Sequence, residues 1–297
     1  MSQLDIPLST EHDLGHAVDV PEEFVEREII ATTGMSPRQV RAARSVQHRH
    51  HLSFAEAAIA IGLIRREDLL LALSKHYHYP LLSTAAESQR FSRELVVGFE
   101  PFGPQAEAVR SIRAAVAASA LEAKTNSIAI VGPRSGVGAS YLAANLAVAF
   151  AQAAAPTLLV DANLRKPRIA KMFGVDRRVE GLADALNYRV VDEPQIVHDL
   201  LPGLSILPAG SVPPNPQELL SSPDFANLVA TLRRRQGVVV YDTTDAAECA
   251  DGLIVATRVG AAVIVARRHK TAFAETAKLA ATLRSHHCVI LGSVLDG

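Results

Sequence analysis

The sequence predicts an α/β protein in which a mostly parallel sheet carries helices on both faces and a small helical domain precedes it. Two observations predict this class. From residue 126 onward, apolar runs alternate with helical patterns, and several runs are continuous stretches of Val, Ile and Leu, as in strands that are covered on both faces. Before residue 83, apolar residues recur at helical spacing, which indicates a separate helical domain.

The larger region is expected to contain six strands, with helices between most of them. The strands are residues 127–131, 157–161, 204–208, 238–242, 261–266 and 289–294. The helix expected over residues 140–154 carries no charge, yet at about 22 Å it is too short for a bilayer core of about 30 Å. We therefore expect it to be buried. Ligands of such a sheet bind at the carboxyl ends of its strands.

The N-terminal third divides into three parts. Residues 1–21 are polar and lack apolar periodicity, which predicts a flexible tail. Residues 22–82 are expected to form the helical domain, because Ser36-Pro37 is typical of a helix start, Gly62 of a helix end, and residues 67–76 repeat leucine at helical spacing. Polar residues and prolines predict a linker at 83–103. The sheet domain follows at 104–297.

Composition and charge narrow the classes of function. The 297 residues carry a formal net charge of −1, so nothing draws the whole chain to nucleic acid, and no nucleic-acid partner is expected. Cys249 and Cys288 lack the spacing of metal ligands, which favours reduced core thiols. The polar N-terminus shows no secretory signal, so a cytoplasmic location is expected.

The loop after the first expected strand has the layout of a phosphate-binding P-loop. Gly132, Gly136 and Gly138 let the backbone turn and point several N–H groups at one anion beside a helix N-terminus. Ser140 stands where the loop's hydroxyl would bind Mg²⁺, a place that a simple helix cap could also occupy. The preceding position, which carries a lysine in a P-loop, is Ala139.

Two aspartates, Asp161 and Asp242, end expected strands, each after an apolar run. Either one alone could merely cap a strand end. Beside a glycine loop, however, carboxylates at the tips of neighbouring strands can hold a magnesium ion and orient a nucleophile. The sequence therefore predicts a P-loop NTPase-type sheet with a Mg²⁺ site made by Ser140, Asp161 and Asp242.

Further motifs lie at residues 107–113, 161–167 and 207–222. Asp161-Ala-Asn-Leu-Arg-Lys-Pro167 resembles the Asp-x-Asp-x-Arg-x-Pro signature of the bacterial tyrosine kinases, P-loop kinases that govern capsule and exopolysaccharide assembly. The first motif is similar to their Glu-x-x-Arg-x-x-Arg oligomerisation motif, and the last resembles the segment before their Walker B strand. The resemblance spans about residues 102–297. It implies ATP and Mg²⁺ as cofactors, with catalytic roles for Asp161, Asp242 and Arg165.

The resemblance extends to contacts and partners. It implies that ATP contacts the loop and the start of the next helix, namely Gly132, Arg134, Ser135, Gly136, Val137, Gly138, Ala139, Ser140 and Tyr141. It also implies a homo-oligomer assembled through Glu107, Arg110 and Arg113. The implied partner is a membrane polysaccharide co-polymerase, the chain-length determinant. Membrane association, peripheral to the inner membrane, would come only through that partner.

The N-terminal region adds a second resemblance. Residues 53–70 are similar to a module shared with type II secretion ATPases and found on exosortase-associated chain-length-determinant tyrosine kinases. Versions of that module that bind cyclic di-GMP carry an Arg-Leu-Gly run, whose place is taken here by Ser53-Phe54-Ala55. We therefore expect this domain to dock on a partner rather than to bind a nucleotide.

The sequence departs from the family pattern at the site itself. Without the lysine that Ala139 replaces, phosphoryl transfer should slow by about 10² to 10³, while backbone N–H groups still bind phosphate. Arg134, Arg165 and Lys166 are the expected substitutes for the lost charge. Asn163 also replaces the second acidic residue of the signature. Chemistry should therefore suffer more than binding.

Three functions stay open at this point. The first is a tyrosine autokinase that regulates exopolysaccharide chain length and export, with Tyr77, Tyr79 or Tyr188 as acceptor. The second is a pseudokinase or adaptor that binds ATP and the membrane regulator without phosphotransfer. The third is a MinD- or ParA-like ATPase in which Arg134 crosses a dimer interface.

Overall fold

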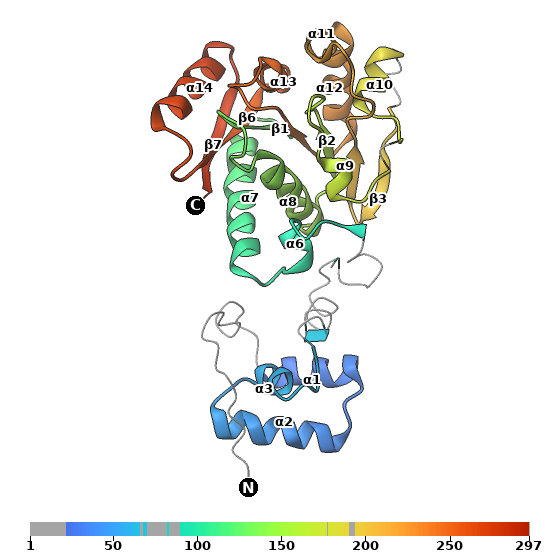
Figure 1. The fold of residues 1–297 in the computed structure, drawn as a ribbon, viewed down its shortest axis with the longest axis vertical. Coiled ribbons are helices and arrows are strands. Elements are labelled where there is room, and N and C mark those ends of the chain that lie inside the picture. Colours follow the sequence, from blue (N-terminus) through green and yellow to red (C-terminus); the bar gives the residue numbers. More distant parts are fainter. Residues whose placement is uncertain are drawn as a thin grey trace. The chain divides into compact units, whose positions relative to one another are not determined.

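The computed structural model describes residues 22–65, 68–69, 82, 90–176, 178–189 and 194–296. It falls into two compact units (Figure 1). Each unit has its own apolar core. The smaller unit contains the N-terminal helices and residues 102–104. The larger unit contains the described residues from 82 to 101 and from 105 onward.

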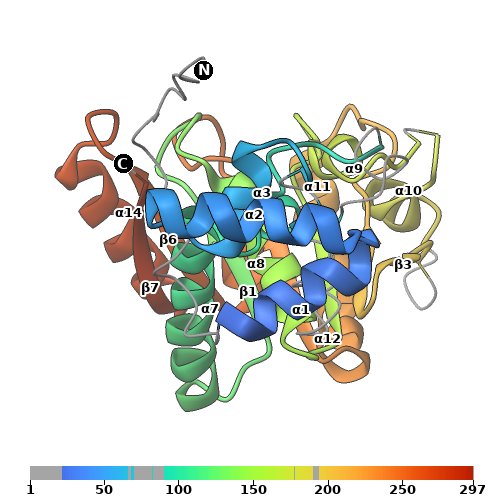
Figure 2. The same ribbon diagram turned by 90° about the horizontal axis from the view of Figure 1, so that it is seen from below.

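The smaller unit is helical over its described residues. Its helices are α1 (Glu22–Thr33), α2 (Pro37–His50) and α3 (Phe54–Ala60). The expected helix start is confirmed, because Ser36 caps α2 in a capping box with Gln39. α1 lies beside α2 (Figure 2), and Arg44 Nη2 of α2 lies 2.8 Å from Glu26 Oε1 of α1. The helix expected over residues 67–76 lies outside the described residues apart from 68 and 69.

A sheet of seven strands, counted over the described residues, runs through the larger unit. The strands are β1 (Ser127–Val131), β2 (Thr157–Asp161), β3 (Val197–Leu201), β4 (Leu204–Leu207), β5 (Val238–Asp242), β6 (Ala261–Arg267) and β7 (Val289–Asp296). Their order is β3-β4-β2-β5-β1-β6-β7, and all neighbours are parallel except β3 and β4. The expected mostly parallel sheet is confirmed, and each of the six expected strands is present.

β3 is the strand that the apolar runs do not reveal. It is an antiparallel edge strand that turns into β4 at Pro202-Gly203, where Gly203 has a φ of +78°. Its register with β4 is interrupted between Val197 and Leu201. An edge strand with such pairing carries no continuous run of Val, Ile and Leu, which is the signal of a strand buried on both faces.

Helices cover both faces of the sheet (Figure 1). They are α6 (Val96–Phe99), α7 (Pro104–Glu122), α8 (Ala139–Gln152), α9 (Ile169–Met172), α10 (Leu182–Asn187), α11 (Pro216–Ser221), α12 (Pro223–Arg235), α13 (Asp251–Val259) and α14 (Phe273–Ser285). Alternate strand residues enter two clusters: Ile128 and Ile130 pack with α7 and α8, whereas Ala129 and Val131 pack with α10 to α14. α8 is buried along nearly its whole length, as its uncharged sequence predicts. No helix of the described residues is both long and apolar enough to span a membrane.

The segment before α7 differs from the linker expected at 83–103. Its described residues 90–101 pack on α8, because the fully buried Asn145 accepts a hydrogen bond from Val97 N at 3.1 Å and donates one to Glu94 O at 2.8 Å. A Cβ on Gly98 would lie 2.6 Å from Leu82 Cδ1. The glycine that suggested flexibility therefore serves close packing.

Candidate nucleotide-binding site

The carboxyl ends of β2, β5 and β1 lie side by side, because these strands are neighbours in the sheet. Asp161, the last residue of β2, pairs in register with Asp242, the last residue of β5, and Asp242 also pairs with Ile130 of β1. The glycine loop follows β1 and leads into α8. The structure thus brings the loop and the two predicted carboxylates to one edge of the sheet.

The loop from Gly132 to Gly138 needs glycine for two different reasons. Gly136 and Gly138 have φ angles of +78° and +92°, a region that residues with a Cβ rarely adopt. At Gly132 a Cβ would lie 2.5 Å from the Val137 side chain. α8 begins directly after Gly138 without a side-chain cap. Its first turn contains Ala139, Ser140 and Tyr141, and its free N–H groups can bind an anion.

Asp161 organises the loop that follows β2. Its side chain is fully buried. Oδ1 accepts a hydrogen bond from Asn163 N at 3.2 Å, and Oδ2 accepts bonds from Arg168 N at 3.1 Å and Ile169 N at 3.0 Å. Burial raises the pKa of Asp161 to about 7, although the three N–H donors oppose this shift. The strand-capping role that the sequence allowed is therefore real for this residue.

Asp242 is buried without such donors. Within the described residues, neither of its carboxylate oxygens has a hydrogen bond of normal geometry. Burial raises its pKa well above the ordinary value, the charge of Asp161 raises it further, and the nearby Ser140 hydroxyl offsets this only in part. Buried carboxylate oxygens that lack partners are rare and need an explanation.

A hydrated divalent cation would supply what this pair of carboxylates lacks. It would neutralise two buried acidic groups that repel each other and would satisfy the oxygens of Asp242, directly or through its waters. Ser140, whose buried hydroxyl oxygen lies in the first turn of α8, adds a hard ligand of the kind that Mg²⁺ prefers. The residues present therefore fit a magnesium ion.

Two of the expected substitute cations are engaged in ion pairs. Arg165 forms a bidentate pair with the buried Asp251, with Nε–Oδ2 at 2.7 Å and Nη2–Oδ1 at 3.3 Å. Lys166 pairs with Glu248, and this partner raises the lysine pKa. Arg165 thereby ties the loop after β2 to the first turn of α13. Neither side chain carries an unshared charge to the glycine loop.

The third expected substitute, Arg134, joins the glycine loop to the turn after β6. Arg134 Nη1 donates to the Lys270 carbonyl oxygen at 2.9 Å and, in the other direction, Arg267 Nη1 donates to the Gly136 carbonyl oxygen at 3.4 Å. Arg134 Nη2 also lies 3.7 Å from Glu275 in the first turn of α14. Crossed contacts thus fix the loop against this turn.

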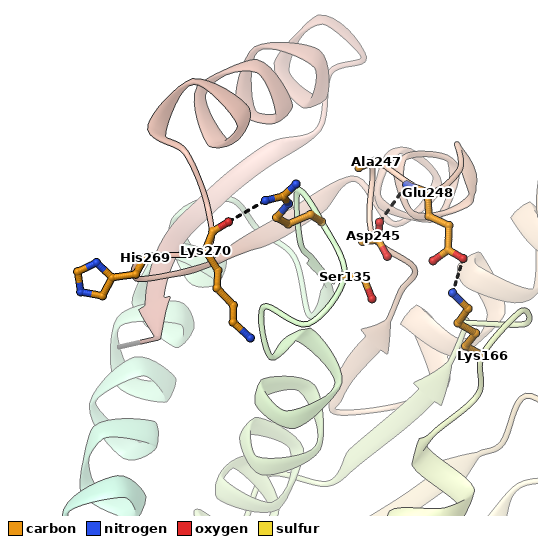
Figure 3. Close-up of a pocket in the computed structure, with 8 residues that line it drawn as sticks. Ser135, Lys166, Asp245, Ala247, Glu248, His269 and Lys270 are labelled. Carbon is orange, nitrogen blue, oxygen red and sulfur yellow. Dashed lines mark hydrogen bonds and ion pairs between the residues drawn. The ribbon is translucent and has the colours of Figure 1, made fainter.

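A pocket of about 700 Å³ opens in front of the loop (Figure 3). Its lining residues come from three strand-end segments and the loop after β2: Arg134, Ser135, Lys166, Asp245, Ala247, Glu248, His269 and Lys270. The sequence predicts the first three of these but not the turns after β5 and β6. Their position directly after strands was the signal that could have found them, since all parallel strands end at the same edge.

The predicted oligomerisation motif lies on α7 and contributes no residue to the lining of the pocket. Arg110 Nε donates to Glu107 Oε2 at 2.9 Å, and Arg113 Nη1 donates to the Ala149 carbonyl oxygen at 3.3 Å. The Glu107 side chain is 62% exposed, whereas that of Arg110 is 16% exposed. Within this chain the two arginines brace α7, and Glu107 presents the open part of the motif.

A strand, a glycine loop and a buried helix, flanked by two strand-end aspartates, define a P-loop nucleotide-binding fold. No family model matches the chain. The chain is 33% identical to the putative tyrosine-protein kinase EpsB of Ralstonia solanacearum over 254 residues, which is 82% of this chain and 34% of EpsB. It is 31% identical to the tyrosine-protein kinase YwqD of Bacillus subtilis over 208 residues, which is 70% of this chain and 87% of YwqD.

The solved structures agree with this class. The chimerical protein CapA2B2 has a TM-score of 0.62 at 31% identity and covers 75% of this chain and 96% of its own. The cell division ATPase MinD of Pyrococcus furiosus has a TM-score of 0.52 at 23% identity, covering 58% and 71%, and so shares the fold alone. The chain belongs to the bacterial tyrosine-protein kinase family. It spans about a third of the length of EpsB.

Proposed function

We propose that this chain binds ATP with Mg²⁺ at the edge of the sheet and acts as a tyrosine autokinase-like protein. The observation that carries the proposal is Asp242, a fully buried carboxylate beside Ser140 and the glycine loop. Among the described residues, neither of its oxygens has a hydrogen bond of normal geometry. Membership of the kinase family and the fold support it. Asp161, Asp242 and Ser140 would hold Mg²⁺, which neutralises phosphate charge during transfer when it is bound.

The chain's own groups would divide the remaining work. Backbone N–H groups from Gly132 to Tyr141 would bind the phosphates, because the glycine loop leads directly into the first turn of α8, which has no side-chain cap. The three N–H bonds to Asp161 would keep that carboxylate in place. Arg165 would position this loop through Asp251 rather than touch the phosphate.

The acceptor tyrosine that the structure favours is Tyr188. It lies at the end of α10 and is 70% exposed, whereas Tyr241 is fully buried. Tyr77 and Tyr79 lie outside the described residues. Loss of label in Tyr188→Phe, with label retained in Tyr241→Phe, would assign the acceptor.

The adaptor without phosphotransfer is the second candidate. Ala139 favours it, together with the engagement of Arg165 and Lys166 in ion pairs. The MinD-like alternative would need Arg134 at a dimer interface, whereas this side chain contacts Lys270 O and Glu275 of its own chain. These contacts make the third candidate the weakest.

One experiment separates the candidates. The purified protein is incubated with Mg²⁺ and γ-labelled ATP, and both released phosphate and label on protein are followed. The autokinase labels tyrosine and loses the label in Asp242→Asn but not in Asp176→Asn, whose carboxylate is surface-exposed. The adaptor binds ATP and gives neither product, and the ATPase releases phosphate without labelling. A protein that binds no ATP would overturn the proposal.

The same proposal places the protein in exopolysaccharide chain-length control and export, in the cytoplasm and at the inner membrane through a membrane co-polymerase. The small helical unit would be its docking domain, as in the exosortase-associated kinases, and Glu107, Arg110 and Arg113 would join copies of the chain. Co-purification of the full chain with the co-polymerase tests the first point. Sedimentation of Glu107→Ala against Glu122→Ala tests the second, because both glutamates are exposed on α7.

A further inference from the structure

The glycine loop lacks its own ammonium group, yet a lysine from another segment lines the pocket beside the loop. Lys270 follows β6, more than a hundred residues after Ala139 in sequence, and lines the same pocket as Ser135 and Arg134 of the loop. Figure 3 shows its side chain extending from the turn toward the entry of α8, while the neighbouring His269 points away.

Within the part of the chain that the structure describes, the charge of Lys270 is unshared. Among the described basic side chains around the loop, Lys166 pairs with Glu248, Arg134 binds Lys270 O, and Arg267 contacts Gly136 O and Asp296. No described residue forms a side-chain hydrogen bond or ion pair with the Lys270 ammonium, which is exposed to solvent. A cation that the protein itself leaves without a partner can meet an incoming anion without first breaking an ion pair.

The backbone of Lys270 is held firmly although its side chain is not. Lys270 N donates to Arg267 O at 3.1 Å, and Thr271 N donates to the same oxygen at 2.9 Å. On the other side, the Lys270 carbonyl accepts from Arg134 of the glycine loop. The turn and the loop are therefore fixed together, so the lysine emerges at a defined distance from the phosphate-binding backbone.

We propose that Lys270 supplies, from the turn after β6, the ammonium group that position 139 lacks, and that it contacts the terminal phosphate of bound ATP. This inference rests on the proposed ATP site. An ammonium group suits the role because it is a compact charge with three donors on a flexible stem. Arg134 acts here as a positioning residue, because it holds the lysine's backbone instead of replacing its charge.

The test measures the affinities of Mg-ATP and Mg-ADP by calorimetry for the full chain. Lys270→Ala should weaken ATP binding by about tenfold to a hundredfold, the worth of one charge-assisted hydrogen bond, and should weaken ADP binding less, because ADP lacks the terminal phosphate. Lys270→Arg should keep most of the affinity. Lys278→Ala, which removes an exposed lysine from the following helix, is the matched control.

A double variant gives the sharper readout. Adding Ala139→Lys to Lys270→Ala should restore ATP binding, because the loop then carries its own ammonium group. If the wild type binds ATP and Lys270→Ala binds it as well as Lys278→Ala does, Lys270 has no such role. A double variant that stays as weak as Lys270→Ala would equally overturn the inference. A wild type that binds neither nucleotide would overturn the ATP proposal as well.

Discussion

The ends of β2 and β5 place two aspartates in register, yet their surroundings differ. At β2, three backbone N–H groups of the following loop donate to Asp161. At β5, the described residues give neither oxygen of Asp242 a hydrogen bond of normal geometry. The same residue type thus organises a loop at one strand end, whereas at the other its oxygens stay without a donor among the described residues. The two positions should respond differently to substitution.

The largest effect is expected at the end of β2. Asp161→Ala should lower the free energy of unfolding by about 2–4 kcal/mol, since buried N–H donors lose their acceptor. Urea denaturation without nucleotide or Mg²⁺ measures this. Asp161→Asn, which keeps an acceptor oxygen, should lose less. An unchanged unfolding midpoint in Asp161→Ala would mean that these bonds do not hold the loop.

A somewhat smaller loss is expected where the β2 loop meets α13. Arg165→Ala should cost about 1–3 kcal/mol of unfolding free energy, because the buried Asp251 loses a bidentate partner whose own side chain is 36% exposed. Thermal and urea unfolding both report the change. A stability equal to that of the wild type, with phosphotransfer abolished, would instead make Arg165 a catalytic residue.

The end of β5 should show the opposite sign and a dependence on pH. Burial places the pKa of Asp161 at about 7, against an ordinary 3.8, and also raises that of Asp242. Between pH 3.8 and about pH 7, the folded protein keeps carboxyl protons that the unfolded chain has lost. The contribution of the two aspartates to the free energy of unfolding therefore falls as the pH rises from about 4 to 7. The fall is at most about 1.4 kcal/mol per pH unit for each group.

Asp242→Asn should therefore stabilise the Mg²⁺-free protein by about 1 kcal/mol at pH 7 and by less at pH 5, because it removes a buried acid whose burial costs more free energy as the pH rises. The difference in unfolding free energy between the variant and the wild type, measured at both pH values, isolates the pair from other acidic groups. A difference that stays constant with pH would argue against the coupling of the two aspartates.

The smallest effect is expected for the surface pair beside the pocket. Lys166→Ala should leave the free energy of unfolding nearly unchanged, because Lys166 and Glu248 are 65% and 37% exposed and solvent screens their attraction. The same urea titration provides the comparison with Arg165→Ala. A loss as large as that of Arg165→Ala would remove the distinction between the buried and the exposed ion pair.

Continuous apolar runs predicted the six buried strands because a strand covered on both faces leaves that pattern in sequence. The glycine loop, Asp161 and Asp242 could be placed together for the same reason, since parallel strands end at one edge. β3 left no such pattern. The packing of residues 90–101 depends on hydrogen bonds to the buried amide of Asn145. The local sequence pattern does not predict these bonds, because they join residues that are far apart in the chain.

The pairing of the cations could not be predicted from the sequence. Arg165 and Asp251 are 86 positions apart, and the arginine is also compatible with a role at the phosphate. Whether the side chain of Arg134 or of Lys270 keeps an unshared charge depends on which carbonyl and carboxylate groups the fold brings next to each of them. Sequence spacing identifies the place of a ligand, whereas long-range contacts decide which side chain remains available to it.

The crossed contacts between the glycine loop and the turn after β6 also bear on the entropy of binding. Because Arg134 holds the Lys270 carbonyl and Arg267 holds that of Gly136, two segments that a ligand would otherwise have to order are already ordered in the free protein. Binding of a polyphosphate then costs conformational entropy of the ligand but little conformational entropy of the loop. Such a loop favours quick capture of its ligand and a small heat-capacity change on binding.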